Sequence, residues 1–140
     1  MEIRSFSVDD ADEVVALWNA CELVVPWNDP VKDIGRKLAH SPELFLVGEV
    51  DFRIVASAMG GFDGHRGWIY YLAVSPDCRR MGLGRAMVAE VTKRLLEQGC
   101  PKINIMVRES NQAIVGFYRA LGYQNDPVVT LSQKIESKGR

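Results

Sequence analysis

The N-terminal part of the chain changes from a strand-like to a helical spacing of hydrophobic positions. Residues 2–6, EIRSF, alternate and predict a short strand. Acidic residues then gather at positions 9–13, where negative charge favours the start of a helix. An apolar face at helical spacing follows, made of Val14, Leu17, Trp18 and Cys21. Pro26 ends that helix, and a second helix is predicted from Asp29 to His40.

The middle of the chain predicts three strands. Residues 44–50, LFLVGEV, and residues 53–61, RIVASAMGG, flank Asp51 and Phe52, which is the spacing of a tight antiparallel hairpin. The glycine-rich residues 61–67 predict a turn. Residues 68–76, WIYYLAVSP, are aromatic and β-branched, so they predict a well-buried strand.

Helices and strands continue to alternate in the C-terminal half. Apolar residues recur every four positions and predict a helix that ends at Gly99, namely Leu83, Met87, Val91 and Leu95. A strand at 102–107 and a helix at 110–123 follow, then a last strand at 128–135, with a further short strand at 123–126. This mixed order predicts an α+β fold, and the length of 140 residues predicts a single domain over 1–140.

Composition narrows the class of protein. The chain is 47% hydrophobic and 25% charged, which is typical of a globular protein, and no apolar run approaches the roughly 20 residues of a membrane span. The acidic N-terminal residues do not resemble a signal or transit peptide, so we expect a cytoplasmic protein. The three cysteines fit neither a disulfide framework nor a zinc motif, and we expect no metal.

Charge is distributed unevenly along the chain. Residues 1–78 carry 13 acidic and 6 basic side chains, a balance of −7, whereas residues 79–140 carry 5 acidic and 11 basic ones, a balance of +6. The sum of −1 argues against a nucleic-acid partner, and no membrane partner is expected. The asymmetry suggests that one half binds an anion and the other a cation, unless helix-surface charges fell unevenly.

The loop in DCRRMGLGRAM, residues 77–87, has the chemistry of an anion site. The start of a helix exposes unpaired backbone N–H groups, and glycine at 82 and 84 would let phosphate oxygens approach them. Arginine side chains add charge and bidentate hydrogen bonds, namely Arg79, Arg80 and Arg85. The lysine and hydroxyl of a P-loop are missing, and Met87 replaces the third glycine of a dinucleotide fingerprint. A plain glycine turn before a basic helix is the alternative.

Two motifs resemble those of the GNAT superfamily of N-acetyltransferases. The first, Arg-x-x-Gly-x-Gly after a strand, is present as Arg79, Gly82 and Gly84. The second is NQAIVGFYRALGY, residues 111–123, with Asn111 and Tyr118 in the pattern. The chain is most similar to the small bacterial YpeA type. The resemblance implies a twisted, mostly antiparallel sheet of six to seven strands flanked by about four helices.

The same resemblance implies acetyl-CoA as the acyl donor. Its pyrophosphate would lie on the amides of the loop, with Arg79, Arg80, Gly82, Leu83, Gly84 and Arg85 as its contacts. The pantetheine arm would pair with the backbone of Leu72, Ala73 and Val74, and Asn111 would hold the pantetheine or the phosphates. Tyr118 would be the general acid that protonates the leaving thiolate.

The general base stays open. Related enzymes often carry an acid or histidine at the positions of Trp68 or Tyr70, or a glutamate at that of Met106, and this chain does not. Three alternatives remain: an acceptor that binds neutral, a water held by Tyr70 or Tyr71, or a side chain from the loops. The loop candidates are Asp63, His65, Glu49 and Asp51.

The acceptor is expected to be a primary amine on a small molecule or peptide. From Asp9 to Asp33 there are seven acidic residues against Lys32 alone, which suits a cationic amine. Aromatic side chains could pack against it, namely Trp18, Trp27, Trp68 and Tyr70, although Trp18 has core spacing. The predicted function is direct acetyl transfer in a ternary complex. The alternative is a coenzyme A-binding sensor or interaction module, and a homodimer could form through the edge of the strand at 128–135.

Overall fold

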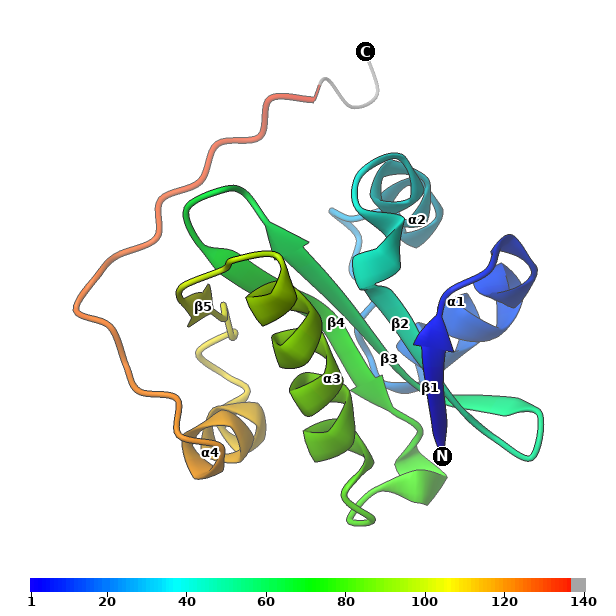
Figure 1. The fold of residues 1–140 in the computed structure, drawn as a ribbon. Helices are drawn as coiled ribbons and strands as arrows, with labels where there is room; N and C mark the ends of the chain where they lie inside the picture. The colour runs from blue at the N-terminus through cyan, green and yellow to red at the C-terminus, as the bar shows by residue number, and fades with distance from the viewer. Residues whose placement is uncertain (137–140) are drawn as a thin grey trace. The chain divides into compact units, whose positions relative to one another are not determined.

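The computed structural model describes residues 1–136, which fall into two compact units that divide after Met106. The first unit contains five strands and three α-helices, and the second contains one α-helix, α4 (Gln112–Ala120) (Figure 1). The strands are β1 (Glu2–Ser5), β2 (Phe45–Val50), β3 (Arg53–Phe62), β4 (Gly67–Val74) and β5 (Ile103–Asn104). The helices of the first unit are α1 (Ala11–Ala20), α2 (Pro30–Ala39) and α3 (Leu83–Glu97).

The strands form one sheet in the order β1-β2-β3-β4-β5. The first four pair antiparallel with their neighbours, so most of the sheet follows the chain as a meander. β5 is parallel to β4 and pairs only at Gly67 with Ile103 and at Trp68 with Asn104. β1–β4 therefore form a continuous antiparallel sheet, and among the described strands β4 has a partner on its β5 side only at its first two residues.

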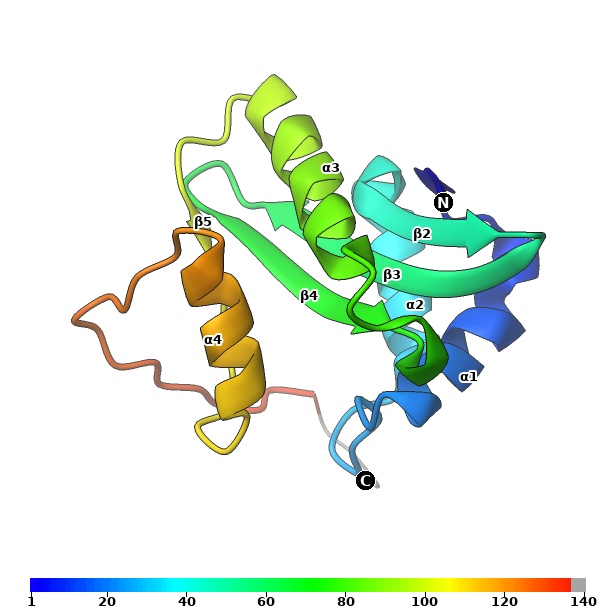
Figure 2. The same ribbon diagram turned by 90° about the horizontal axis from the view of Figure 1, so that it is seen from below.

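Helices cover both faces of this sheet. α1 and α2 lie on one face and α3 lies on the other (Figure 2). On the α1 face Trp18 is fully buried and packs with Phe45, Val47 and Met59 in one apolar cluster. On the α3 face the helix approaches closely, because a Cβ atom added at Gly60 would lie 2.8 Å from Val91 Cγ1. Glycine at this position is thus required by packing.

The predicted hairpin is confirmed. Asp51 and Phe52 form its two-residue turn and both have positive φ angles, 49° and 63°. Left-handed backbone at both turn residues gives the twist that a two-residue hairpin needs. The predicted helices are also found, each within a few residues of its expected bounds.

The C-terminal strands are the main correction. No strand forms over 123–126 or 128–135, and β5 has two residues where 102–107 were predicted, so the described chain has five strands instead of six or seven. Four apolar side chains of this segment are largely exposed, namely Val128, Val129, Leu131 and Ile135. Alternating hydrophobic and polar residues show only that a segment is compatible with a strand. The strand forms only if its backbone can pair with the edge of a neighbouring strand. A homodimer through this segment stays a prediction.

The single domain over 1–140 also stays a prediction, and its last four residues lie outside the described part of the chain. Within that part, the helices are all too short or too polar to cross a membrane.

Candidate functional site

β4 contains a bulge at its centre. Met59 pairs with Tyr70 and Ser57 pairs with Ala73, so Ala58 alone stands opposite both Tyr71 and Leu72. Tyr71 has a φ angle of 51°, a left-handed conformation that is uncommon for a residue other than glycine. A bulge of this kind bends the strand and redirects its backbone groups.

The bulge lies in the part of β4 that faces no further strand. Beyond Trp68, none of the described strands pairs with β4 on its β5 side. Three predicted donor contacts, Leu72, Ala73 and Val74, are in this open part. Ala73 is buried, and its two neighbours are half-buried. An extended ligand could add its own hydrogen-bonding groups to such an edge.

The loop after β4 leads directly into the start of α3. A short 3₁₀ turn, Pro76–Cys78, is followed by Arg79, whose Nε donates a hydrogen bond to the Val74 carbonyl at 3.2 Å. Arg80 has a φ angle of 63° and Gly82 one of 77°. Gly82 occupies the N-cap position, and within the described structure no side chain caps this helix.

The first turn of α3 therefore offers its backbone N–H groups to solvent. The first intrahelical bond comes from the Ala86 N–H, which leaves the amides of residues 83–85 outside the helical pattern. Arg79, Arg80 and Arg85 are exposed around this turn. A Cβ atom added at Gly82 would meet no atom within 4 Å, so the surface there is open. Positive side chains and unpaired amides together favour an anion.

An ion pair fixes the far side of the loop to β3. Asp77 pairs with Arg53 at 3.0 Å and accepts a hydrogen bond from the Ser75 hydroxyl at 2.5 Å. The bond from Arg53 is the largest cause that holds the pKa of Asp77 well below its ordinary value. Sequence reasoning missed Arg53, since nothing in a strand-initial arginine indicates a partner 24 residues away.

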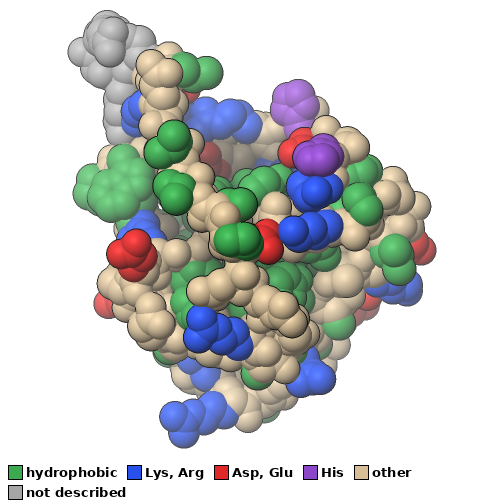
Figure 3. All heavy atoms as spheres, turned by 90° about the vertical axis from the view of Figure 1, so that its left-hand side faces the viewer, with side chains coloured by type: hydrophobic (Ala, Val, Ile, Leu, Met, Phe, Trp, Pro, Cys, Tyr) green, Lys and Arg blue, Asp and Glu red, His purple; other side chains and the backbone are tan. Residues whose placement is uncertain are grey.

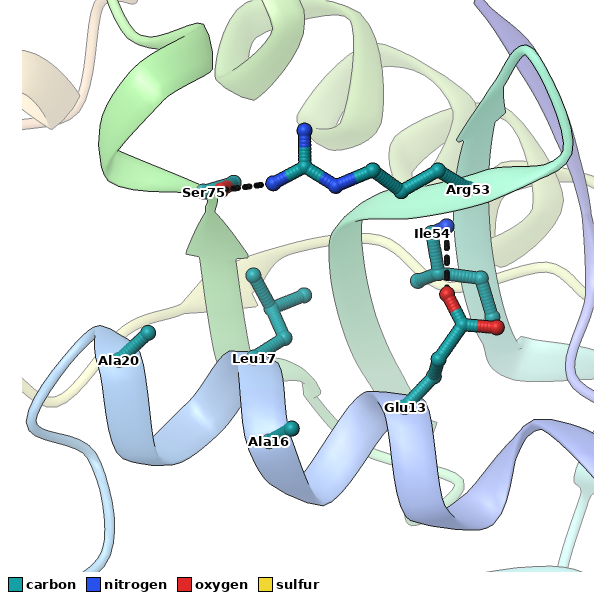
Figure 4. Close-up of a pocket in the computed structure, with 7 residues that line it drawn as sticks. All are labelled: Glu13, Ala16, Leu17, Ala20, Arg53, Ile54 and Ser75. Carbon is teal, nitrogen blue, oxygen red and sulfur yellow. Dashed lines mark hydrogen bonds between the residues drawn. The ribbon is translucent and has the colours of Figure 1, made fainter.

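Arg53 also lines a pocket of about 200 Å³ between α1 and the strand ends (Figure 4). Glu13 crosses it to accept the Ile54 N–H at 3.0 Å. The pocket is lined by Glu13, Ala16, Leu17, Ala20, Arg53, Ile54 and Ser75. None of these was predicted as a site residue.

The other two predicted site residues belong to α4 in the second unit. The Asn111 side chain caps this helix by accepting the Ile114 N–H at 3.3 Å. Tyr118 is 6% exposed and its ring makes edge contacts with the rings of Phe117 and Tyr123. Burial raises the pKa of Tyr118 above its ordinary range, and Tyr123 adds to this. The phenol therefore stays protonated to a higher pH than that of an ordinary tyrosine.

Two of the general-base candidates already have structural roles. Both carboxylate oxygens of Asp63 accept hydrogen bonds, Oδ1 from the Arg66 and His65 N–H groups and Oδ2 from Trp68 Nε1. The bond from the Arg66 N–H is the largest cause that lowers the pKa of Asp63. Glu49 forms an ion pair with Arg4 at 2.8 Å. The hydrogen bonds to Asp63 stabilise its carboxylate as an anion, which weakens it as a base.

The remaining candidates differ in their environments. The Tyr71 hydroxyl donates to Asp33 Oδ2 at 2.5 Å, whereas Tyr70 is 42% exposed, and partial burial raises its pKa. Asp51 lies in the hairpin turn. His65 is exposed in the turn between β3 and β4.

The predicted acceptor-packing aromatics separate into two groups. Trp18 is fully buried and belongs to the core, whereas Trp27 is 59% exposed.

On the face shown in Figure 3, acidic, basic and hydrophobic side chains are interspersed, and the basic ones do not form a continuous band. Over residues 1–136, no three His, Cys, Asp or Glu side chains are grouped as metal ligands would be.

Comparisons with known proteins agree on a family. The model of the Acetyltransferase (GNAT) family matches residues 11–123. An acetyltransferase from Yersinia pestis (strain Pestoides F) is 53% identical over 135 residues, 96% of each chain. The ribosomal-protein-S18-alanine N-acetyltransferase from Escherichia coli has a similar structure, with a TM-score of 0.71, 23% identity, and coverage of 86% of this chain and 76% of that one.

A second solved structure is similar over nearly the full length. AAC(6')-Iy in complex with the bisubstrate analogue CoA-S-monomethyl-acetylneamine gives a TM-score of 0.78 at 16% identity, covering 96% of this chain and 97% of that one. At such identities the likeness shows the fold alone. The predicted α+β fold is confirmed, apart from the number of strands.

Proposed function

Because the chain belongs to the acetyltransferase (GNAT) family and is an N-acetyltransferase, we propose that it transfers the acetyl group of acetyl-CoA to a primary amine. The amine attacks directly, in a ternary complex with the donor. The observation that carries this proposal is that two features of the first unit follow each other directly along the chain. The open edge of β4 leads through a short loop into the uncapped start of α3.

These two features match the two ends of the donor. The pantetheine arm contains amide groups that can pair with the backbone of Leu72–Val74, and the pyrophosphate suits the amides and arginines of residues 79–85. A structurally similar protein forms a complex with a CoA-containing bisubstrate analogue, which supports a CoA thioester as the donor.

The reaction needs groups that stabilise charge and move protons. A cationic amine first loses one proton to water; the neutral nitrogen then forms a bond to the thioester carbonyl carbon, the carbon–sulfur bond breaks, and the nitrogen loses its second proton. A backbone N–H on the open edge of β4 can donate to the carbonyl oxygen as negative charge develops there. We assign Tyr118 as the group that protonates the leaving sulfur, and the proton released by the nitrogen restores the phenol through water.

The acceptor proposed is a cationic amine on a small molecule or peptide. Of the seven acidic residues between Asp9 and Asp33, Asp10 pairs with Arg4 and Asp33 with Arg36, whereas Asp9, Asp12 and Glu22 are exposed and support a positively charged acceptor. Exposed aromatic side chains such as Trp27 and Tyr70 are able to pack against one. A cytoplasmic location is proposed as well, because Cys21, Cys78 and Cys100 are all free thiols, which suits a reducing compartment.

Release of the coenzyme A thiol from acetyl-CoA, measured with a panel of polyamines, lysine peptides, aminoglycosides and amino acid derivatives, tests the proposal. Tyr118→Phe should lower kcat by about 10²-fold or more, the size expected for a general acid, and leave the Kd for coenzyme A near that of the wild type. Tyr123→Phe is the matched control, because it removes a phenol whose ring touches that of Tyr118.

Unchanged turnover in Tyr118→Phe would remove Tyr118 from the acid role. Tight binding of acetyl-CoA without turnover on any amine would instead favour the coenzyme A-binding sensor.

A further inference from the structure

Side chains from β3, α1 and α2 hold the bulge in β4, and the proposed function gives these side chains no role. We propose that Ser57, which is bonded to Trp18, positions the left-handed Tyr71 backbone together with Asp33, which is bonded to the Tyr71 hydroxyl, and that they thereby position the open edge of β4. This inference rests on the proposed function, since that edge is where the acyl donor would bind. The three side chains act as positioning residues and touch no reacting atom.

The backbone at Tyr71 needs an external restraint. Its φ angle of 51° puts a bulky aromatic residue in a region that non-glycine residues adopt at a cost. Such conformations persist where the surrounding structure determines them, and they cluster at functional sites. Here the conformation falls at the one position where β4 carries an extra residue relative to β3.

The main restraint is a buried hydrogen-bond chain. The Ser57 hydroxyl, which is fully buried, donates to the Tyr71 carbonyl at 2.8 Å. The same oxygen accepts a hydrogen bond from Trp18 Nε1 at 2.9 Å. The Ser57 hydroxyl therefore links α1 to the bulge, because it both donates one hydrogen bond and accepts another.

The Tyr71 side chain is restrained as firmly as its carbonyl. Its ring stacks on the indole of Trp18, with centroids 3.8 Å apart and planes 12° from parallel. Its hydroxyl donates to Asp33 of α2, whose other oxygen pairs with Arg36 at 2.9 Å. The bulge is thus tied at two points, to α1 through Trp18 and to α2 through Asp33.

The consequence concerns the peptide that joins Tyr71 to Leu72. Its carbonyl is held by Ser57, so the direction of its N–H is fixed as well, because the peptide group is planar. Without the restraint, Tyr71 can relax toward an ordinary strand conformation and turn this peptide. A displacement of about 1 Å at a reacting group is enough to cost roughly 10²-fold in rate.

Ser57→Ala tests the inference, because it removes only the hydroxyl. Val47→Ala is the matched control: Val47 is also fully buried, pairs with Ser57 across β2 and β3, and has no bond to Tyr71. Two measurements are made on both variants. The first is the rate of hydrogen exchange in the peptide covering residues 69–74 of the free protein. The second compares the change in kcat with the change in the Kd for coenzyme A.

In Ser57→Ala we expect at least about tenfold faster exchange over 69–74 and a kcat lowered by about 10- to 100-fold, with a smaller change in Kd. Val47→Ala should lower the melting temperature at least as much, without the local rise in exchange or the selective loss of kcat. Ser57→Thr, which keeps a hydroxyl, should restore part of kcat.

Equal effects in the two alanine variants would overturn the inference, because the network would then contribute only to stability. Unchanged exchange over 69–74 in Ser57→Ala would overturn it too. The exchange measurement needs no substrate, so a wild-type protein that binds coenzyme A but turns over no amine would defeat the proposed function while leaving this result interpretable.

Discussion

Left-handed backbone occurs at both ends of the proposed donor site, and the two places are stabilised in different ways. At the bulge in β4, Tyr71 is fixed by a buried hydroxyl, a stacked indole and a carboxylate. In the loop before α3, Gly82 is exposed, and a Cβ atom there would meet nothing within 4 Å. The bulge relies on tertiary contacts, whereas the loop relies on the residue type.

The difference matches the role that we propose for each place. The bulge must present one peptide in one direction, which calls for rigid surroundings. The loop must leave several amides accessible to phosphate oxygens, and contacts that fixed it by burial would also block them. Substitutions at the two places should therefore separate stability from binding.

The largest effect is expected from Trp18→Ala. This change removes a fully buried indole together with its stacking on Tyr71 and its bond to Ser57, and should lower the free energy of unfolding by about 3–5 kcal/mol. Denaturant unfolding measures it. Trp27→Ala is the control, because an indole that is 59% exposed should cost far less. Comparable losses in the two variants would show that the bulge is not held by burial.

A moderate effect is expected from Gly82→Ala. The added Cβ meets no atom, so the backbone cost of the φ angle of 77° remains, about 1–2 kcal/mol. Coenzyme A should bind about tenfold more weakly, equivalent to 1.4 kcal/mol, as calorimetry can measure. Gly64→Ala is matched, with a φ angle of 90° and open space as well. It should lose similar stability but keep coenzyme A affinity, and equal affinity in both variants would contradict the loop assignment.

The smallest effect is a pH dependence at the bulge. Burial, followed by the hydrogen bond to Asp33, raises the pKa of Tyr71 above its ordinary value of about 10. The neutral phenol is favoured in the folded state, so its contribution is complete below pH 10 and is lost as pH rises toward the folded pKa. Above about pH 10 the free energy of unfolding should therefore fall more steeply in the wild type than in Tyr71→Phe. Parallel curves would mean that the bond to Asp33 adds no stability.

The sequence predicted the loop more fully than the bulge. Glycine at 82 and arginine at 79 follow a strand in an order that local chemistry explains, and the structure finds the expected turn and helix start. The bulge had one unused signal, the serine in the otherwise apolar run IVASAMGG, residues 54–61. A polar residue in a buried strand needs a partner, and Ser57 has two.

Local patterns therefore determined the helices, the hairpin, the glycine turn at the start of α3 and the family, because period, turn chemistry and short motifs act within a few residues. The tertiary structure alone decided that residues 128–135 form no strand, and that Arg53 pairs with Asp77. It also decided that Tyr71 is held from α1 and α2. The contacts of Tyr71 join residues that are 14 to 53 positions apart in the sequence. A short-range pattern in a single sequence does not encode which distant side chain will contact which backbone group.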